Sequence, residues 1–371
     1  MLINCVTRPL GELYKWNNGE VISPHLSRRG FVRSAIAAVA GVYGGSTVLS
    51  SCGDAEDASS LESGTLVIPD ITVVPEGEML PFITPQSQFY RIDTAIGVTP
   101  QIDAATWSMR ITGMVDRDVI LTLEDINAMP QTSHVITLGC VSNEVGGDLI
   151  GTAQWGGVLL SEVLKLSGVK SGAEQLVSTS VDGWTCGTPL DAVMDGRPAM
   201  LVTSMNGEAL SQEHGYPVRM IVPGLFGYVS ATKWLSEISL STWDAFDAYW
   251  IERGWSKTGP FLASSRIDVP RNGASVAAGK TIVGGFAWAP RSGVKAVQLQ
   301  IDDDEWLGAE LLDGSTGDTW TQWKYEWNAN PGDHRLTVRC VSSNGEVQTD
   351  EVTRVDPDGA RGHHQIDISC A

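Results

Sequence analysis

Apolar and polar residues alternate with a period of two in the last third of this chain, and this restricts that region to β-structure. The pattern is clearest over residues 297–301, 323–327 and 336–340. Successive side chains of a strand point to opposite faces, so each of these segments has one apolar face that can pack against a second sheet. Turn residues such as those at 343–345 separate the segments. Residues 266–371 are therefore predicted to form a β-sandwich of immunoglobulin-like size.

The tryptophans of this predicted sandwich allow two interpretations, a ligand cage or a packed core. They are Trp288, Trp306, Trp320, Trp323 and Trp327. Packing is favoured, because aromatic side chains bury large areas in small sandwiches. Cys340 falls on the apolar face and is expected to be a buried small hydrophobe. Residues 246–265 are expected to form a linker to the preceding domain.

The preceding region, residues 85–245, mixes short strand and helix patterns. Residues 107–115 and 133–140 alternate like strands, whereas 122–129 and 161–168 look like short helices, the first with a capping box that starts at its threonine. No regular βαβ rhythm connects them, which favours an α+β fold over a doubly wound sheet. The length of 371 residues also suggests two globular domains.

Charge and motif content exclude several classes of protein. The chain has 25 Lys+Arg against 44 Asp+Glu, a formal net charge of −19, which argues against a nucleic-acid partner. Its 6 cysteines are too few and too scattered for a disulfide scaffold. The sequence contains no CxxC, CxxCH, HExxH, GxSxG, GxGxxG or Walker motif. The sequence therefore gives no motif support for a zinc protease, a serine hydrolase or a standard nucleotide-binding enzyme.

Residues 1–51 have the layout of an export signal: a basic region, a mildly apolar run and then small residues. The pair Arg28 and Arg29, with Phe31 two places on, resembles a twin-arginine signal. The apolar run contains several glycines and is less apolar than a typical spanning helix, which fits that route better than membrane insertion.

The apolar run ends at Cys52 in a sequence that resembles a lipobox. An ordinary cleavage site and an uncleaved helical anchor are the alternatives to lipidation. The expectation is a protein in the periplasm or on the outer face of the cytoplasmic membrane, anchored by lipid at Cys52. Residues 52–84 would then form an acidic tether followed by an extended, proline-rich segment.

The most informative segment for chemistry is 137–160. A predicted strand delivers Cys140 at its end, and a polar turn with Gly146 and Gly147 follows. Loops at strand ends commonly present reactive groups, and glycines let a large group approach the backbone. Cys140 could be a nucleophile, a metal thiolate or a structural thiol, and on placement alone the structural interpretation leads.

A second informative segment, 214–240, holds His214, Arg219 and Lys233 around an apolar strand and a glycine-punctuated loop. Three potential cations in a strongly acidic chain indicate seats for an anionic group such as a phosphate. Surface charge together with a core histidine is the alternative for any one of them taken alone.

Taken together, these segments resemble the sulfite oxidase family of molybdopterin-dependent oxidoreductases from about Phe89 to the end of the chain. The motifs that carry the resemblance are residues 89–93, 137–143, 205–207, 214–219, 222–224, 231–234, 288–290 and 298–302. The resemblance implies a mixed, mostly-β molybdopterin-binding domain over 85–245, an immunoglobulin-like dimerisation domain over 266–371, and one molybdenum–molybdopterin per chain.

The resemblance also implies roles for individual residues. Cys140 matches the thiolate ligand of the metal, and a soft thiolate suits a metal that dithiolene sulfurs already hold. Arg91 matches the arginine that lines the approach to the metal and cofactor, and Asn143 is expected to orient the ligand. Positions that hold the pterin and its phosphate match Tyr90, Asp182, His214, Arg219, Ala231, Thr232 and Lys233. Cys186 is a rival thiol that we interpret as structural.

Departures from the family pattern concern the substrate. Glu144 and Val145 stand where sulfite oxidases of the family carry basic residues, and Thr203 stands at the position of their active-site tyrosine. Glu144 near an anionic substrate would be repulsive. The expected reaction is a two-electron oxygen-atom transfer, either oxidation of sulfite or a related sulfur compound or reduction of an S- or N-oxide such as methionine sulfoxide.

The partners implied are a small substrate, a separate cytochrome or membrane redox subunit, since no haem motif occurs, and a second copy of the chain bound through the sandwich. A metal-free, cell-surface binding lipoprotein is the alternative from another class; Glu144 and Thr203 motivate it, and the retention of Cys140 opposes it. A metal site at residues 363, 364 and 370 lacks recognised ligand spacing and is set aside.

Overall fold

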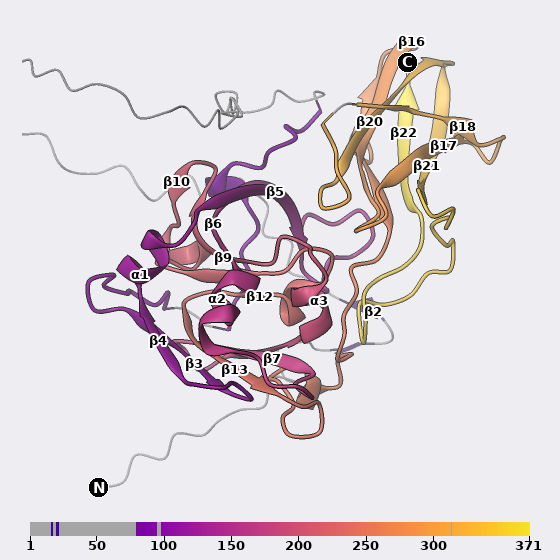
Figure 1. Ribbon diagram of the computed structural model, residues 1–371. Helices are drawn as coiled ribbons and strands as arrows, with labels where there is room; N and C mark the ends of the chain where they lie inside the picture. The colour runs from indigo at the N-terminus through magenta and orange to yellow at the C-terminus, as the bar shows by residue number, and fades with distance from the viewer. Residues whose placement is uncertain (1–15, 18–19, 22–78, 95–97, 313) are drawn as a thin grey trace, which may run out of the picture. The chain divides into compact units, whose positions relative to one another are not determined.

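The computed structural model describes residues 16–17, 20–21, 79–94, 98–312 and 314–371 (Figure 1). The chain divides into two compact units, Met1–Thr65 and Leu66–Ala371. In the first unit, β1 (Trp16–Asn17) pairs antiparallel with β2 (Glu20–Val21). The expected twin-arginine pair, the lipidation site and the tether as far as residue 78 lie outside the described residues.

One antiparallel sheet carries the two segments that the sequence marks for chemistry. Its strand order is β12-β11-β9-β6-β5, with β10 paired to β9. The strands are β5 (Thr132–Gly139), β6 (Ile150–Leu159), β9 (Met200–Met205), β10 (Glu208–Ala209), β11 (Arg219–Ile221) and β12 (Ala231–Thr232). Because β5 ends at Gly139, Cys140 is the first residue after the strand, as the sequence predicts.

A second sheet of the same domain has the order β4-β3-β13-β7-β8. Its strands are β3 (Ser108–Gly113), β4 (Val119–Thr122), β7 (Gln175–Ser180), β8 (Thr185–Pro189) and β13 (Leu235–Ser241). The pair β3–β13 is parallel and the other pairs are antiparallel. The pairing of β3 with β13 ties the beginning of the domain to its end, since the two strands are far apart in sequence.

Three short helices cover these sheets: α1 (Leu123–Ala128), α2 (Leu160–Ser167) and α3 (Leu190–Met194). The predicted capping box of α1 is confirmed, because Thr122 Oγ1 accepts from the Asp125 amide and the Asp125 carboxylate accepts from the Thr122 amide at 2.8 Å. Helix α2 buries Leu160, Val163 and Leu164. None of the helices in the described residues is long and apolar enough to cross a bilayer.

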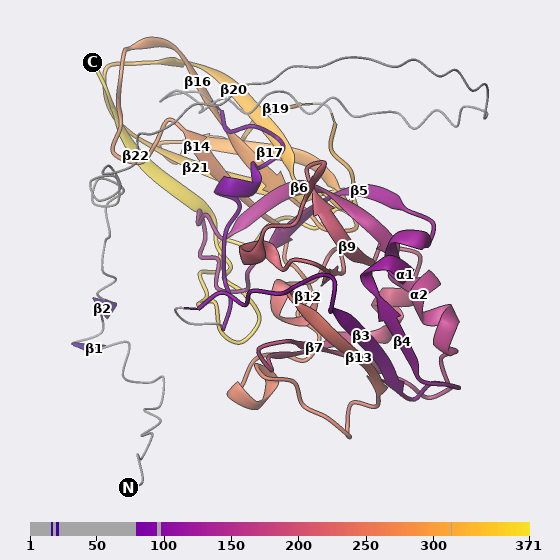
Figure 2. The same cartoon turned by 90° about the vertical axis from the view of Figure 1, so that its left-hand side faces the viewer.

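The C-terminal residues form the predicted sandwich (Figure 2). One sheet has the order β14-β16-β20-β19 and the other β15-β22-β21-β17-β18. The strands are β14 (Ser264–Val269), β15 (Ser275–Val276), β16 (Gly279–Trp288), β17 (Val294–Ile301), β18 (Leu307–Gly308), β19 (Glu310–Leu311), β20 (Thr321–Ala329), β21 (Gly332–Ser342) and β22 (His364–Cys370). The predicted fold class, a mostly-β α+β domain followed by a sandwich, is confirmed.

The side chains of the sandwich follow the predicted alternation. Val297, Leu299 and Cys340 are fully buried, and so is Trp323. Trp288 and Trp320 are also buried, which supports core packing for these tryptophans. Trp306 and Trp327 are partly exposed; Trp327 still packs against the core, whereas Trp306 lies beneath the Arg339 guanidinium at 4.0 Å from its ring centroid.

The expected linker is a packed part of the structure. Residues 246–265 include a short 3-10 turn, Ile251–Arg253, and the buried side chain of Phe261. The ring of Phe261 lies so close to Gly139 that a Cβ there would fall 2.4 Å from its Cζ atom. Gly139 is therefore required where this segment crosses the end of β5.

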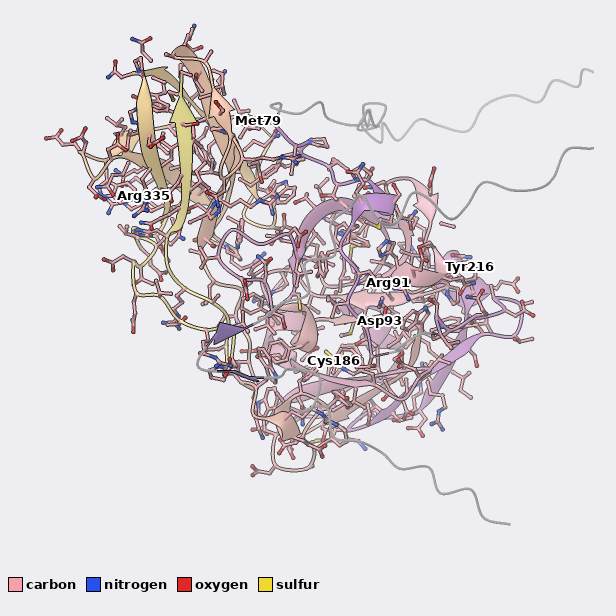
Figure 3. All side chains as sticks on the ribbon, turned by 180° about the vertical axis from the view of Figure 1, so that it is seen from behind. Met79, Arg91, Asp93, Cys186, Tyr216 and Arg335 are labelled. Atoms are coloured by element: carbon pink, nitrogen blue, oxygen red, sulfur yellow. The ribbon has the colours of Figure 1, made fainter. Side chains whose placement is uncertain are left out.

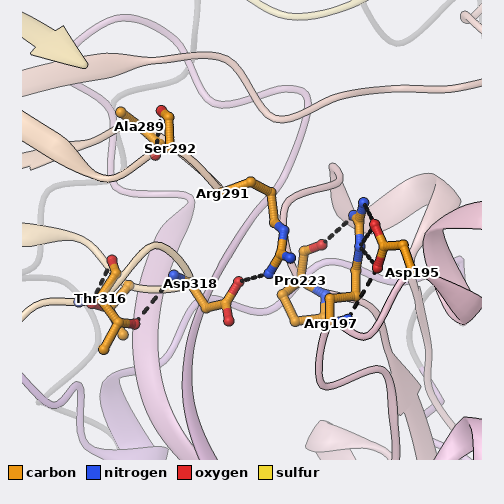
Figure 4. A network of polar contacts seen from close by, with 9 residues as sticks. Asp195, Arg197, Pro223, Ala289, Arg291, Ser292, Thr316 and Asp318 are labelled. Carbon is orange, nitrogen blue, oxygen red and sulfur yellow. Dashed lines mark hydrogen bonds and ion pairs between the residues drawn. The ribbon is translucent and has the colours of Figure 1, made fainter. Parts of the chain in front are cut away.

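Backbone and polar contacts continue from the sandwich onto the first sheet. The amide of Trp320 donates to Thr137 Oγ1 at 2.7 Å, and the Thr137 amide donates to the carbonyl of Asp318 at 2.9 Å. Figure 4 shows the neighbouring polar network, in which Arg291 pairs with Asp318 at 2.7 Å and Arg197 donates to the carbonyl of Pro223 at 2.8 Å. Strand β5, which carries Cys140, is thus supported from the sandwich side as well as by its own sheet.

Candidate active site

One pocket brings together most of the side chains predicted from the sequence. The pocket is open to solvent at its mouth, and the space inside it together with that mouth amounts to about 940 Å³. The predicted residues that line it are Tyr90, Cys140, Asp182, His214, Arg219, Ala231 and Lys233. They come from the ends of strands in both sheets and from the segment before β3, so the pocket exists only in the folded domain.

Cys140 is held by its neighbours in the turn after β5. Its amide donates to the carbonyl of Leu149 at 2.9 Å, and the Ser142 amide donates to its Sγ at 3.4 Å. Burial raises the pKa of the Cys140 thiol, and the hydrogen bond from Ser142 opposes that rise. A soft metal ion would compete with the proton for this sulfur.

Arg219 is a buried cation without a counter-ion among the described residues. Only 6% of the residue is exposed, and no carboxylate of the described chain lies within ion-pair distance. Its Nη1 donates to the carbonyl of His214 at 3.2 Å, its guanidinium lies 5.0 Å from the Trp155 ring centroid, and its Nε has no partner. Burial lowers the pKa of Arg219 to about 10, so it is charged at neutral pH.

Two lining residues have further buried polar atoms that find no partner among the described residues. Ser180 Oγ and Trp184 Nε1 belong to lining residues and make no hydrogen bond. Buried polar groups are nearly always satisfied, and an anion beside Arg219 together with polar ring atoms would supply what these groups lack. The residues present therefore fit a molybdopterin with its phosphate.

His214 is neutral in this pocket. Its Nε2 donates to the carbonyl of Gln86 at 2.9 Å, since a carbonyl oxygen can only accept. Burial, followed by the charge of Arg219, lowers the pKa of His214 to about 4. Its Nδ1 is therefore free of a proton at neutral pH and can accept a hydrogen bond from a ligand.

Lys233 pairs with Asp93 at the pocket wall. The Nζ–Oδ2 distance is 2.8 Å, and both side chains are about a tenth exposed. Burial lowers the pKa of Lys233 to about 8, although Asp93 counteracts this effect. For Asp93, burial acts to raise the pKa, but the hydrogen bonds and charges of Lys233 and Arg91 outweigh it and hold the pKa below its usual value.

Arg91 is not among the residues that line the pocket, although its neighbours Tyr90, Ile92 and Asp93 are. Its Nε lies 3.1 Å from an oxygen of Asp93, its Nη1 lies 3.5 Å from Glu213, and its Nη2 donates to Thr99 at 2.7 Å. Figure 3 shows Arg91 and Asp93 next to each other. The two carboxylates hold this guanidinium in a partly exposed position outside the cavity.

Asn143 and Thr232 also lie outside the pocket lining. Asn143 Oδ1 accepts from the Leu149 amide at 2.8 Å and so closes the turn that contains Cys140. Thr232 Oγ1 is buried and shares a hydrogen bond with Ser178 Oγ at 2.6 Å, which joins β12 to β7. Both residues support the walls of the pocket rather than face its interior.

The sequence reasoning missed an aromatic wall of the pocket. It consists of Trp184, Tyr228, Trp234, Trp250 and Trp255. The ring centroids of Tyr228 and Trp255 lie 5.8 Å apart, and those of Trp250 and Trp255 lie 6.2 Å apart. Trp250 and Trp255 belong to the segment expected to be a linker. Its many aromatic residues were the one sequence feature that could have indicated a packed wall.

The residues that depart from the family pattern, the rival cysteine and the histidine of the rejected metal site all lie outside the pocket lining. Glu144 is exposed and Thr203 lies in β9, and neither lines the pocket. Cys186 is fully buried beside Thr188, which agrees with a structural role. His364 accepts a hydrogen bond from the Ile267 amide, and among the described residues no group of three or more His, Cys, Asp or Glu side chains is arranged to hold a metal ion.

Comparison with known proteins agrees with this fold and pocket. Residues 96–250 match the family described as the oxidoreductase molybdopterin binding domain. The crystal structure of the sulfane dehydrogenase SoxCD from Paracoccus pantotrophus has a similar fold, with a TM-score of 0.68 and 20% identity over 84% of this chain and 92% of that chain. Fold, pocket and matched domain define a molybdopterin-dependent oxidoreductase.

Sequence relatives specify the family. The chain is 31% identical over 157 residues to the uncharacterized oxidoreductase YuiH of Bacillus subtilis, covering 42% of this chain and 76% of that protein. It is 25% identical to the mitochondrial sulfite oxidase of Rattus norvegicus and 26% identical to that of Homo sapiens, covering 74% of this chain in each case. This chain spans 58% of the length of these two sulfite oxidases. It belongs to the sulfite oxidase family of molybdenum-dependent oxidoreductases.

Proposed function

We propose that this protein catalyses a two-electron oxygen-atom transfer at a molybdenum atom ligated by the Cys140 thiolate. The observation that carries the proposal is the position of Cys140 in one pocket with the uncompensated guanidinium of Arg219. When bound, the molybdenum–molybdopterin group supplies a two-electron redox centre. The protein supplies a soft ligand at one end of the pocket and anion-binding groups elsewhere in its wall.

The side chains of the pocket would divide the work of holding the cofactor. The unpartnered Nε of Arg219 would donate to the phosphate, and the unprotonated Nδ1 of His214 would accept from a ring N–H. Ser180 and Trp184 would satisfy their buried donors on the same group. The aromatic side chains keep bulk water from the reacting atoms, which strengthens each polar contact inside the pocket.

The charge of the pocket favours a neutral S- or N-oxide as the substrate over sulfite. The pocket is lined by one arginine, Arg219, and one lysine, Lys233. Arg219 would bind the cofactor phosphate, and Lys233 is paired with Asp93, so neither charge is left for an anionic substrate. Arg91, which would attract an oxyanion, is held outside by carboxylates. Oxidation of sulfite, which the names of the relatives suggest, is the second candidate.

Electrons would pass to or from a separate redox protein, as the family resemblance implies. A cytochrome or a membrane subunit on the outer face of the cytoplasmic membrane would fit the proposed export. We further propose that the sandwich joins two copies of the chain, as the family resemblance implies.

A substrate panel assayed in both directions with artificial electron donors and acceptors tests the function. Methionine sulfoxide and an amine N-oxide with a reduced viologen should show turnover, whereas sulfite with an artificial acceptor should be slower. Metal analysis after expression in a pterin-competent host should give about one molybdenum per chain. Purified protein without molybdenum would contradict the proposal and favour the metal-free binding lipoprotein.

A further inference from the structure

Two side chains of the sandwich contact the turn that follows Cys140. Arg266, in β14, donates from Nη1 to the carbonyl of Gly147 at 2.9 Å. His364, in β22, packs on Gly146 so closely that a Cβ there would fall 2.2 Å from its Cδ2 atom. Gly146 also has a φ of +77°, so its position requires glycine on both counts. Neither sandwich residue lines the pocket.

Hydrogen bonds within the turn connect Gly147 to Cys140. The Gly147 amide donates to the carbonyl of Glu144 at 2.9 Å, and Leu149, two residues further on, donates to Asn143 Oδ1 at 2.8 Å. The carbonyl of Leu149 accepts from the Cys140 amide at 2.9 Å. A shift of Gly147 would therefore move Leu149 and change the backbone direction at Cys140.

Arg266 is itself buried among close neighbours. It is 5% exposed, and its Nε lies 2.9 Å from an oxygen of Asp268. Its guanidinium lies 5.5 Å from the ring centroid of Phe286 and 5.6 Å from that of Trp320, and these two rings stack on each other at 3.8 Å. Nη1 makes the hydrogen bond to the turn, whereas Nε lies close to Asp268 without a hydrogen bond of good geometry.

A buried ion pair is a poor source of stability. The cost of removing two charges from water often exceeds their attraction, so an apolar pair of similar volume would stabilise the fold as well or better. Burial raises the pKa of Asp268, and the charge of Arg266 opposes that rise. Stability alone is therefore a weak reason for this pair, whereas the donation from Arg266 to Gly147 is a specific contact that depends on its geometry.

We propose that Arg266 is a positioning residue for Cys140: it fixes the turn 140–149 from the sandwich and so sets the direction of the Cys140 sulfur. The proposal rests on the proposed function in assigning that sulfur to the metal. Partners that orient a ligand tune the metal that the ligand binds. The sandwich would then act in the chemistry of each single chain, apart from any role in joining two chains.

The test compares the double variant Arg266→Met/Asp268→Asn with wild type. Removing both charges together avoids leaving one buried charge unpaired, so the fold should be kept. The variant Arg335→Met is the matched control, since it removes a cation of the same sandwich whose partner is Asp367, away from the turn. A third variant, Arg266→Lys, keeps the charge and removes the forked donor geometry.

The first readout is the alkylation rate of Cys140 in cofactor-free protein, followed by peptide mass mapping so that the other cysteines do not interfere. The double variant should react about tenfold faster, the expected effect of losing one charge-assisted hydrogen bond on the opening of a loop. Its melting temperature should match or exceed that of wild type. Arg266→Lys should be intermediate, and Arg335→Met should react like wild type.

The second readout is the Mo(V) resonance of the loaded protein, which should shift in the double variant and remain unchanged in Arg335→Met. A wild-type alkylation rate in a folded double variant would overturn the proposal, whatever metal the protein holds. If the double variant is unfolded, a wild-type alkylation rate in Arg266→Lys would overturn it. If wild type binds no molybdenum but the variant reacts faster, the positioning role stands and the proposed function fails.

Discussion

At the scale of single residues, the site depends on burying groups that would be more stable in water. Arg219 is charged and buried with no carboxylate of the described chain beside it, and His214 is buried as a neutral ring. Such groups destabilise the empty protein and become favourable only when a ligand supplies their partners. This is the pattern expected of a binding site, and it leads to two predictions.

Cys140→Ser is expected to abolish turnover and to change the Mo(V) resonance, because a hydroxyl is a hard ligand that replaces a soft thiolate. The melting temperature should be nearly that of wild type, since the substitution removes little volume. Steady-state assays, electron paramagnetic resonance and thermal scans check the three statements. The matched control is Cys186→Ser, at a fully buried cysteine that does not line the pocket. Wild-type activity in Cys140→Ser would end the ligand assignment.

Arg219→Met is expected to weaken cofactor retention by about 10- to 100-fold, the effect of losing a hydrogen bond from a charged group. The cofactor-free variant should be at least as stable as cofactor-free wild type, since an uncompensated buried charge has been removed. The molybdenum-to-protein ratio after dialysis and the melting temperature of the cofactor-free protein measure both effects. Arg110→Met, at an exposed arginine paired with Glu237, should change neither. A loss of stability with full retention of the cofactor would contradict the assignment.

At the scale of elements, the end of β5 is the point where several parts of the chain meet. The sandwich contributes Arg266 and His364, the segment after β13 contributes Phe261, and the backbone at Trp320 bonds to Thr137. Contacts from several elements fix the conformation of a turn more precisely than hydrogen bonds within the turn alone. The free energy of unfolding should therefore depend on the protonation of groups buried at this turn.

His364 should make the protein less stable in mild acid. Burial, followed by the charge of Arg266, lowers the pKa of His364 to about 4 from its usual 6.5. Between these two pH values the unfolded chain binds a proton that the folded chain does not, so stability is full above pH 6.5 and falls as the pH falls.

His364→Gln should reduce the difference in unfolding free energy between pH 7 and pH 5 by about 2 kcal/mol. Urea unfolding at the two pH values measures it. His214 adds a change of the same sign in both proteins, so the comparison isolates His364. An unchanged pH dependence would show that His364 is not buried as a neutral ring.

At the scale of the whole molecule, function depends on where the chain is delivered as well as on its fold. The twin-arginine route carries folded proteins, so export by the proposed signal would suit a protein that binds its proposed cofactor before it leaves the cytoplasm. The signal lies outside the described residues, and its test is a cellular one.

Replacing Arg28 and Arg29 together by Lys is expected to trap the precursor in the cytoplasm, because recognition of the signal depends on the arginine pair. Cell fractionation followed by immunoblotting measures the distribution. Arg33→Lys, a few residues further on, should leave export unchanged. Normal export of the double variant would remove the twin-arginine interpretation.

The sequence alone determined the features that local backbone geometry controls. A period of two predicts strands, because the backbone sends alternate side chains to opposite faces, and this identified the sandwich. The capping residues Thr122 and Asp125 predicted α1 in the same way. Cys140 at a strand end, beside a turn with glycines, was likewise visible in the sequence.

Tertiary structure decided which distant residues meet. It placed Trp250 and Trp255 in the pocket wall although their segment has the sequence of a linker. It also paired Arg91 with Asp93 and Glu213 and directed Arg266 at Gly147. These contacts depend on packing between elements far apart in the chain, and the energy of a charge depends on which groups surround it once water is excluded.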